Sequence, residues 1–203
     1  GTKIANLRSA ASNFVATMLD NDPNRRISIG IVPYNAQVNL GAALRGKFNA
    51  THVHNVTNVN CLELPSAVFA APGIARTTAL PMMAYSDHYY GTNTGNFFTS
   101  PTDTSFARPN FAANYCRQNT NNTVFMPSQN KAALQARING LTAGGNTSIV
   151  LGMKWGTALL DPEAQSVYDD MITEGLMDGN LGGRPFAYDD PESMKVIVLM
   201  TDG

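Results

Sequence analysis

The sequence of 203 residues has little charge and no long apolar run. Only 14% of its residues are charged, the formal net charge is −1, and the 14 Lys and Arg residues are scattered. No basic stripe is present to neutralise phosphates, so we predict no nucleic-acid binding. The longest apolar runs, Ile197–Met200 and Ile149–Met153, are far shorter than the roughly 20 residues that cross a bilayer. We therefore predict no membrane segment in this stretch of chain.

The sequence also lacks the common catalytic motifs. It has no Gly-x-Ser-x-Gly nucleophile elbow, no phosphate-binding loop and no dinucleotide fingerprint. Carboxylates that could form an acid/base pair occur in two loops, at Asp169, Asp170, Asp189, Asp190 and Glu192. Acidic residues in loops are more often solvated than catalytic. The sequence therefore favours a protein that is not an enzyme.

Cysteine is scarce, with only Cys61 and Cys116, both in a polar, turn-rich region. We predict a disulfide between them, which would restrain the unfolded chain by about 4 kcal/mol on the loop-entropy model. Disulfides persist in oxidising compartments, so this pairing favours an extracytoplasmic location. Two unrelated free thiols in a reducing compartment remain an alternative at this point.

Apolar spacing at three and four residues predicts helices. The first is amphipathic and covers Lys3–Leu19, and a short one covers Lys131–Leu141. A third, over Ser148–Leu160, is apolar around much of its circumference. Its Gly152 and Gly156 lie one turn apart, which lets the backbone approach a sheet closely. One or two helical turns are also expected within residues 164–176.

Three segments predict strands. Arg26–Tyr34 is rich in β-branched residues and favours a buried strand, with Gln37–Leu40 as a brief antiparallel edge strand beside it. Lys195–Met200 is continuously apolar, as in strands buried on both faces of a parallel sheet. The order of these helices and strands predicts an α/β fold with an open, doubly wound, mostly parallel sheet.

We interpret residues 1–203 as a single partial domain that carries a long irregular insertion at 43–128 and a shorter one at 161–194. The long insertion is rich in Asn, Thr, Ser, Pro and Gly, and it holds both cysteines and all three histidines. His52 and His54 could bind zinc together with His88. Ordinary loop histidines are favoured, because no cysteine or carboxylate lies at ligand spacing around them.

Two polar loops could form a ligand site. In open α/β sheets, ligands bind at the carboxyl ends of the strands. Thr147 follows a glycine turn, and Asp202 directly follows the apolar Lys195–Met200 segment. A hydroxyl and a carboxylate are hard oxygen ligands that suit Mg²⁺. The alternatives are an ordinary Asp-Gly turn and a helix N-cap at Thr147.

Two motifs resemble the von Willebrand factor A (vWA) family. Residues 195–203, KVIVLMTDG, resemble its strand and third metal loop, and Gly144–Thr147 resembles its second metal loop. The resemblance implies a Rossmann-like vWA fold and a metal-ion-dependent adhesion site, with Thr147 and Asp202 as ligands of Mg²⁺ or another divalent cation. In the family, an Asp-x-Ser-x-Ser loop precedes an amphipathic helix like the predicted first one. The resemblance thus implies a fragment without the first strand and with two of five ligand positions.

Further segments resemble a TadG-like subgroup of bacterial tight-adherence (Tad/Flp) pilus-assembly proteins, namely Ile29–Tyr34, Leu151–Gly156 and Leu159–Pro162. This resemblance implies an extracytoplasmic adhesion or assembly module of a membrane-anchored parent. Its cation would accept a carboxylate from a protein partner. Two alternatives stay open: a metal-dependent hydrolase that uses Asp202 with the acidic loops, and a metal-free structural vWA-like scaffold.

Overall fold

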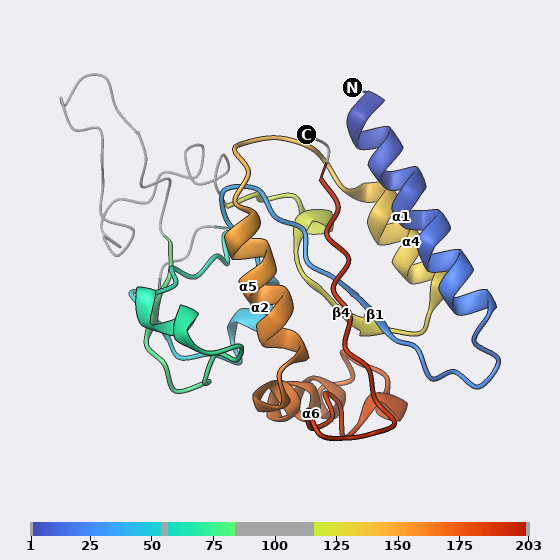
Figure 1. Cartoon of the computed structure of the whole chain (residues 1–203). Coiled ribbons are helices and arrows are strands. Elements are labelled where there is room, and N and C mark those ends of the chain that lie inside the picture. The colour runs from blue at the N-terminus through green and yellow to red at the C-terminus, as the bar shows by residue number, and fades with distance from the viewer. Residues whose placement is uncertain (1, 54–56, 84–115, 202–203) are drawn as a thin grey trace.

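The computed structural model describes residues 2–53, 57–83 and 116–201 (Figure 1). The helices and strands are α1 (Thr2–Asp20), β1 (Ile29–Ile31), α2 (Gly41–Arg45), β2 (Ala50–Thr51), β3 (Leu80–Pro81), β4 (Phe125–Ser128), α4 (Lys131–Gly140), α5 (Ile149–Leu160) and α6 (Gln165–Thr173). Short 3₁₀ helices occur at Ser66–Ala70, Thr120–Asn122, Pro162–Ala164 and Gly179–Leu181. The helices predicted from apolar spacing are confirmed as α1, α4 and α5, and the helical turns expected within residues 164–176 form α6.

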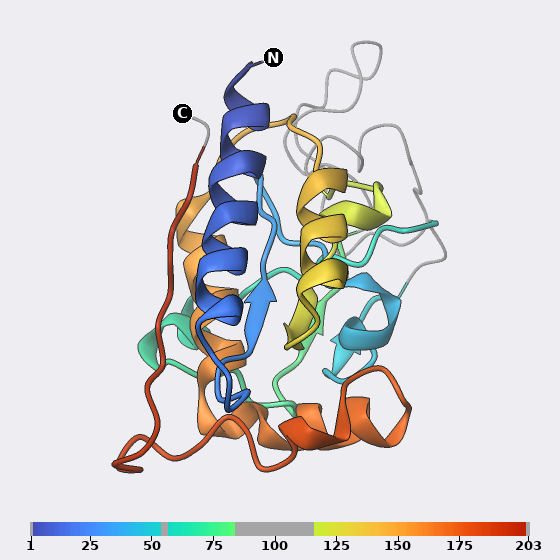
Figure 2. The ribbon, with the colours of Figure 1, turned by 90° about the vertical axis from the view of Figure 1, so that its right-hand side faces the viewer.

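Helices lie on both sides of β1. Helices α1 and α4 pack side by side on one side, and α5 lies on the other (Figures 1 and 2). Val15 of α1 packs with Leu134 and Ile138 of α4 in a small apolar cluster, against which Ile29 and Ile31 of β1 also pack. The apolar face of α1 therefore holds α4 and β1 together.

Each sheet of the described chain has two strands. β1 pairs antiparallel with β4, and β2 pairs parallel with β3. The prediction that Gln37–Leu40 forms an edge strand beside β1 is wrong. Val38 and Leu40 are buried in the main core instead, and Asn39 forms isolated bridges with Cys61 and Thr123. The open, doubly wound, mostly parallel sheet stays a prediction.

The Lys195–Met200 segment, which we call the C-terminal ribbon, is extended but belongs to neither sheet. The expectation that it is buried on both faces is wrong, because Val196 is 62% exposed and Val198 47%. Helix α5 touches one side of it, where a Cβ placed on Gly156 would lie 3.7 Å from Ile197 Cδ1. An apolar sequence indicates a preference for burial, but burial also requires neighbouring strands, and none of the described strands pairs with the ribbon.

The main core surrounds α5. Trp155 is fully buried and meets Phe48 edge to face, with ring centroids 5.3 Å apart. Residues 43–83, predicted as irregular insertion, also supply buried Leu44, Leu62 and Leu80 to this core. This part of the chain is therefore folded against α5 and α6 and contributes to the same core.

Helix α5 also carries a buried lysine. Lys154 is only 6% exposed, and its ammonium group donates to three successive backbone carbonyls, those of Ala71, Pro72 and Gly73, at 2.7, 2.9 and 2.8 Å. Burial lowers its pKa, while the charge of nearby Asp161 opposes that shift. Lys154 thus fastens the 71–73 segment to α5.

Tyr168 of α6 should make the free energy of unfolding decrease at alkaline pH. Its hydroxyl is buried and donates to the carbonyl of Leu159 at 2.8 Å, and burial raises its pKa well above the ordinary value of 10.0. The folded state therefore keeps a proton that the unfolded state loses. This contribution is complete below pH 10 and is lost as the pH rises beyond it, by about 1.4 kcal/mol per pH unit.

Tyr168→Phe should therefore lower the free energy of unfolding by about 1 kcal/mol at pH 7, because the Leu159 carbonyl loses its tyrosine donor. At pH 11 the difference between the two proteins should vanish or reverse. Urea unfolding at pH 7, 9 and 11 measures both. A difference that stays constant over this range would contradict the assignment to Tyr168.

Candidate functional site

The turn that carries Thr147 connects α4 to α5. It needs glycine, because φ is +154° at Gly144 and +80° at Gly145. The N-cap of α5 is Ser148, whose hydroxyl accepts from Leu151 N at 3.4 Å. The alternative that Thr147 is this N-cap is therefore wrong. Thr147 is exposed, so its hydroxyl oxygen is accessible to a ligand.

The chain just after β1 connects this turn to the end of the C-terminal ribbon. The backbone N–H of Ser148 donates to the carbonyl of Asn35 at 2.5 Å, and Asn35 Nδ2 donates to the carbonyl of Gly144 at 3.4 Å. The neighbouring Tyr34 hydroxyl donates to the carbonyl of Met200 at 3.2 Å. The Thr147 turn and the end of the C-terminal ribbon therefore both adjoin Tyr34–Asn35.

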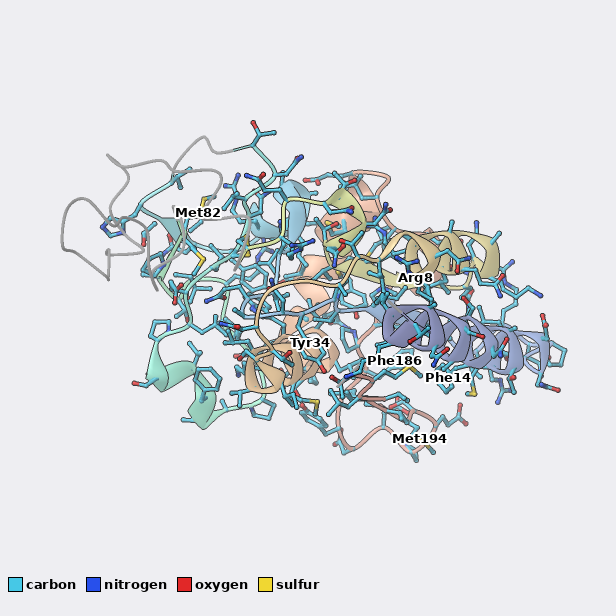
Figure 3. The ribbon with its side chains drawn as sticks, turned by 90° about the horizontal axis from the view of Figure 1, so that it is seen from above. Arg8, Phe14, Tyr34, Met82, Phe186 and Met194 are labelled. Atoms are coloured by element: carbon cyan, nitrogen blue, oxygen red, sulfur yellow. A yellow bond between two sulfur atoms is a disulfide. The ribbon has the colours of Figure 1, made fainter. Side chains whose placement is uncertain are left out.

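Tyr34 takes this position because α5 has a glycine where the two meet. A Cβ on Gly152 would lie 2.7 Å from the Tyr34 ring, which is too close for any larger residue. The view along the helix shows Tyr34 beside α5 (Figure 3). The close approach at Gly152 is to the side chain of Tyr34, which lies outside the described strands, so the predicted approach of α5 to a sheet stays a prediction.

The groups near Tyr34–Asn35 that could bind a metal ion do so through oxygen atoms. Thr147 contributes an exposed hydroxyl, and the carbonyls of Gly144 and Met200 lie close to Tyr34–Asn35. Asp202 lies outside the described residues, two positions beyond Met200. Within residues 2–53, 57–83 and 116–201, no three His, Cys, Asp or Glu side chains gather as a metal site. Hydroxyl and carboxylate oxygens at Thr147 and Asp202 fit Mg²⁺ in chemistry.

The other residues considered from the sequence are dispersed. His52 is exposed, and His54 and His88 lie outside the described residues, so the zinc alternative has one described member. Asp170 forms an ion pair with Arg76, at 2.6 Å between Nη2 and Oδ2. Asp190 accepts from the backbone N–H of Glu192 at 2.8 Å, which stabilises a local turn.

The structure joins Cys61 to Cys116 in a disulfide with a Cα–Cα distance of 5.8 Å. Both cysteines are fully buried. Directly after Cys116, the carbonyl of Arg117 accepts from Asn39 Nδ2 at 2.7 Å. The disulfide therefore fixes the point at which residues 117–122 start, next to the turn that carries Thr147.

Sequence reasoning missed two residues at this edge. Asn35 was detectable, because a polar residue directly after a predicted buried strand is a candidate for a ligand loop. Arg117 had no such signal, since its approach to the turn depends on how the long insertion returns across the molecule. Its guanidinium donates to Thr142 Oγ1 at 3.3 Å.

Comparisons with known proteins add no relative from which function could be transferred. The chain matches no protein-family model, no curated protein and no solved structure. Across the described residues, no helix is both long and apolar enough to span a membrane. A functional proposal therefore depends on the chemistry of the edge at Tyr34–Asn35 and on the two vWA-like motifs.

Proposed function

We propose that the chain is part of a vWA-like, divalent-cation-dependent protein-binding module of an extracytoplasmic bacterial protein, with a role in adhesion or pilus assembly. The observation that supports this most is the meeting of the Thr147 turn and the C-terminal ribbon at Tyr34–Asn35. Loops that converge at one end of an α/β fold are the usual location of a ligand site.

In this proposal, Thr147 and Asp202 hold Mg²⁺ or another divalent cation through oxygen atoms. Magnesium prefers octahedral coordination by oxygen and commonly keeps several waters. A carboxylate from a partner protein replaces one of these waters and completes the coordination at the interface. Binding of the partner then requires the cation, and the module needs no catalytic residue of its own.

The sequence and the disulfide support the cellular setting. The Cys61–Cys116 pair is typical of proteins in oxidising compartments, which agrees with a periplasmic or surface location. The TadG-like motifs favour a parent anchored in the inner membrane, with this module outside the cytoplasm. The partner is expected to be another component of the assembly that presents an exposed Asp or Glu.

Replacing either ligand should weaken cation binding by at least about tenfold, since even the loss of a residue that supports a metal ligand commonly costs about 10- to 100-fold in affinity. Thr147→Ala and Asp202→Ala, each in the full-length protein, are titrated with Mg²⁺ by calorimetry. The same variants should lose partner capture in a pull-down, as should the wild type in EDTA. Thr173→Ala and Asp189→Ala are matched controls, because both residues are exposed and lie outside the Thr147 turn and the ribbon.

Three outcomes separate the alternatives. Partner capture that persists in EDTA would contradict cation-dependent binding and favour the metal-free scaffold. Hydrolytic turnover that is lost in Asp202→Ala would favour the hydrolase. Loss of Mg²⁺ binding and of partner capture together, with the two controls unaffected, supports the adhesion module.

A further inference from the structure

The turn that carries Thr147 lies outside the helices and strands. Residues 143–147 are exposed, they form no helix or strand, and two of them are glycines with positive φ. Glycine adds conformational freedom to a loop, so contacts from outside must select one conformation. On one side this contact is Asn35, which bonds to both Gly144 and Ser148.

On the other side, the turn is held by the end of the long insertion. Arg117, Asn119 and Asn122, which we call the insertion clamp, all bond to Thr142. Asn122 bonds it three times: its Oδ1 accepts from Thr142 N at 3.0 Å and from Thr142 Oγ1 at 2.9 Å, and its Nδ2 donates to the Thr142 carbonyl at 2.9 Å. Asn119 Nδ2 donates to Thr142 Oγ1 at 3.4 Å. Thr142 is thus fixed from the insertion.

Arg117 contacts both Thr142 and the glycine turn. Besides donating to Thr142, its guanidinium packs so closely on Gly144 that an added Cβ there would lie 2.8 Å from Nη1. Its Nε is buried without a hydrogen-bond partner among the described atoms, which is a cost that other contacts of the side chain must offset. The side chain is therefore committed to one position between the insertion and the turn.

The backbone of Arg117 is also held by contacts of its own. Cys116, its neighbour, is linked to buried Cys61, and Asn39 forms a bridge with Cys61 while donating to the Arg117 carbonyl. The disulfide, Asn39 and the Arg117 guanidinium thus form a continuous connection from the insertion to Gly144. Coupling between distant parts of a protein travels through such contiguous contacts.

We infer that Arg117 is a positioning residue for the Thr147 turn, and that the Cys61–Cys116 disulfide acts on the turn through it. The clamp itself follows from contacts alone. Its consequence for ligand binding rests on the proposed function, in which Thr147 binds a cation. Under that function, Arg117 sets the geometry of the site without being one of its ligands, and an intact disulfide is required for a pre-formed site.

Amide hydrogen exchange tests the clamp without any cation. In Arg117→Gln, the protected amides of residues 142–148, among them those of Thr142 and Ser148, should exchange about tenfold faster, which corresponds to the loss of one hydrogen bond of ordinary strength. Amides of α4 around Leu134 should be unchanged. Arg184→Gln is the matched control, because Arg184 also donates to a hydroxyl and a carbonyl, those of Ser28 and Arg26, outside the turn.

Two further variants disturb the contact between Arg117 and Gly144. Gly144→Ala pushes a Cβ against the Arg117 guanidinium, and Cys61→Ala with Cys116→Ala releases the backbone before it. Both should raise exchange in residues 142–148. In Arg117→Gln, either unchanged exchange of these residues or a uniform rise that includes α4 would overturn the inference. Faster exchange with unaltered Mg²⁺ affinity would support the clamp and contradict the proposed function of Thr147.

Discussion

Lys154→Met should lower the free energy of unfolding by about 3–5 kcal/mol, because it removes a buried charge from a site built around it. Methionine keeps most of the side-chain volume but leaves the carbonyls of residues 71–73 without their donor. It also leaves buried Asp161 without the lysine charge beside it. Urea unfolding followed by far-UV circular dichroism measures the loss.

Lys131→Met is the matched control for this effect. Lys131 forms an ion pair with Asp20 at 2.5 Å, but both side chains are largely exposed. Exposed pairs typically contribute about 0–1 kcal/mol, so this variant should stay within that range. Equal losses in the two variants would show that Lys154 has no special role in attaching the 71–73 segment.

Removing the disulfide should have a comparable effect. The Cys61–Cys116 bond closes a loop with a sequence separation of 55 residues, and its loss should lower the free energy of unfolding by about 4 kcal/mol on the loop-entropy model. The double variant Cys61→Ala, Cys116→Ala is compared with the wild type by chemical unfolding. The region between the cysteines contributes to the main core, so the variant is expected to unfold at clearly lower denaturant concentration.

Reductant supplies the control for the double variant. Dithiothreitol should lower the stability of the wild type to that of the variant, and it should leave the variant unchanged. A variant as stable as the oxidised wild type would show that the unfolded chain is already restrained in this region, so that the bond adds little.

The helices were predictable because their information is local. The three-and-four spacing of α1 is complete within one segment. Helix α4 is capped at its N-terminus by the neighbouring Asn130, whose side chain accepts from Ala133 N at 3.0 Å. The glycines of α5 indicated that a neighbour packs closely there, and Gly152 lies against the Tyr34 side chain where the sequence predicted a sheet. Local periodicity and capping do not depend on the rest of the fold.

Strand pairing was less predictable, since it joins distant segments. The partner of β1 is β4, about a hundred positions later along the chain, and Pro127 within β4 speaks against a strand. The C-terminal ribbon shows the reverse case, where a strongly apolar sequence lies extended without a partner in the described sheets. The candidate site shows the same contrast between local and long-range features. The glycine turn before Thr147 could be predicted from the sequence, whereas the approach of Arg117 to that turn could not.

The C-terminal ribbon also affects how the chain behaves in concentrated solution. Its aliphatic side chains are exposed, and none of the described strands pairs with its backbone. An unpaired extended segment of this kind can form backbone hydrogen bonds with an extended segment of another molecule. A formal net charge of −1 gives little mutual repulsion between molecules. The isolated 203-residue chain should therefore associate at high protein concentration.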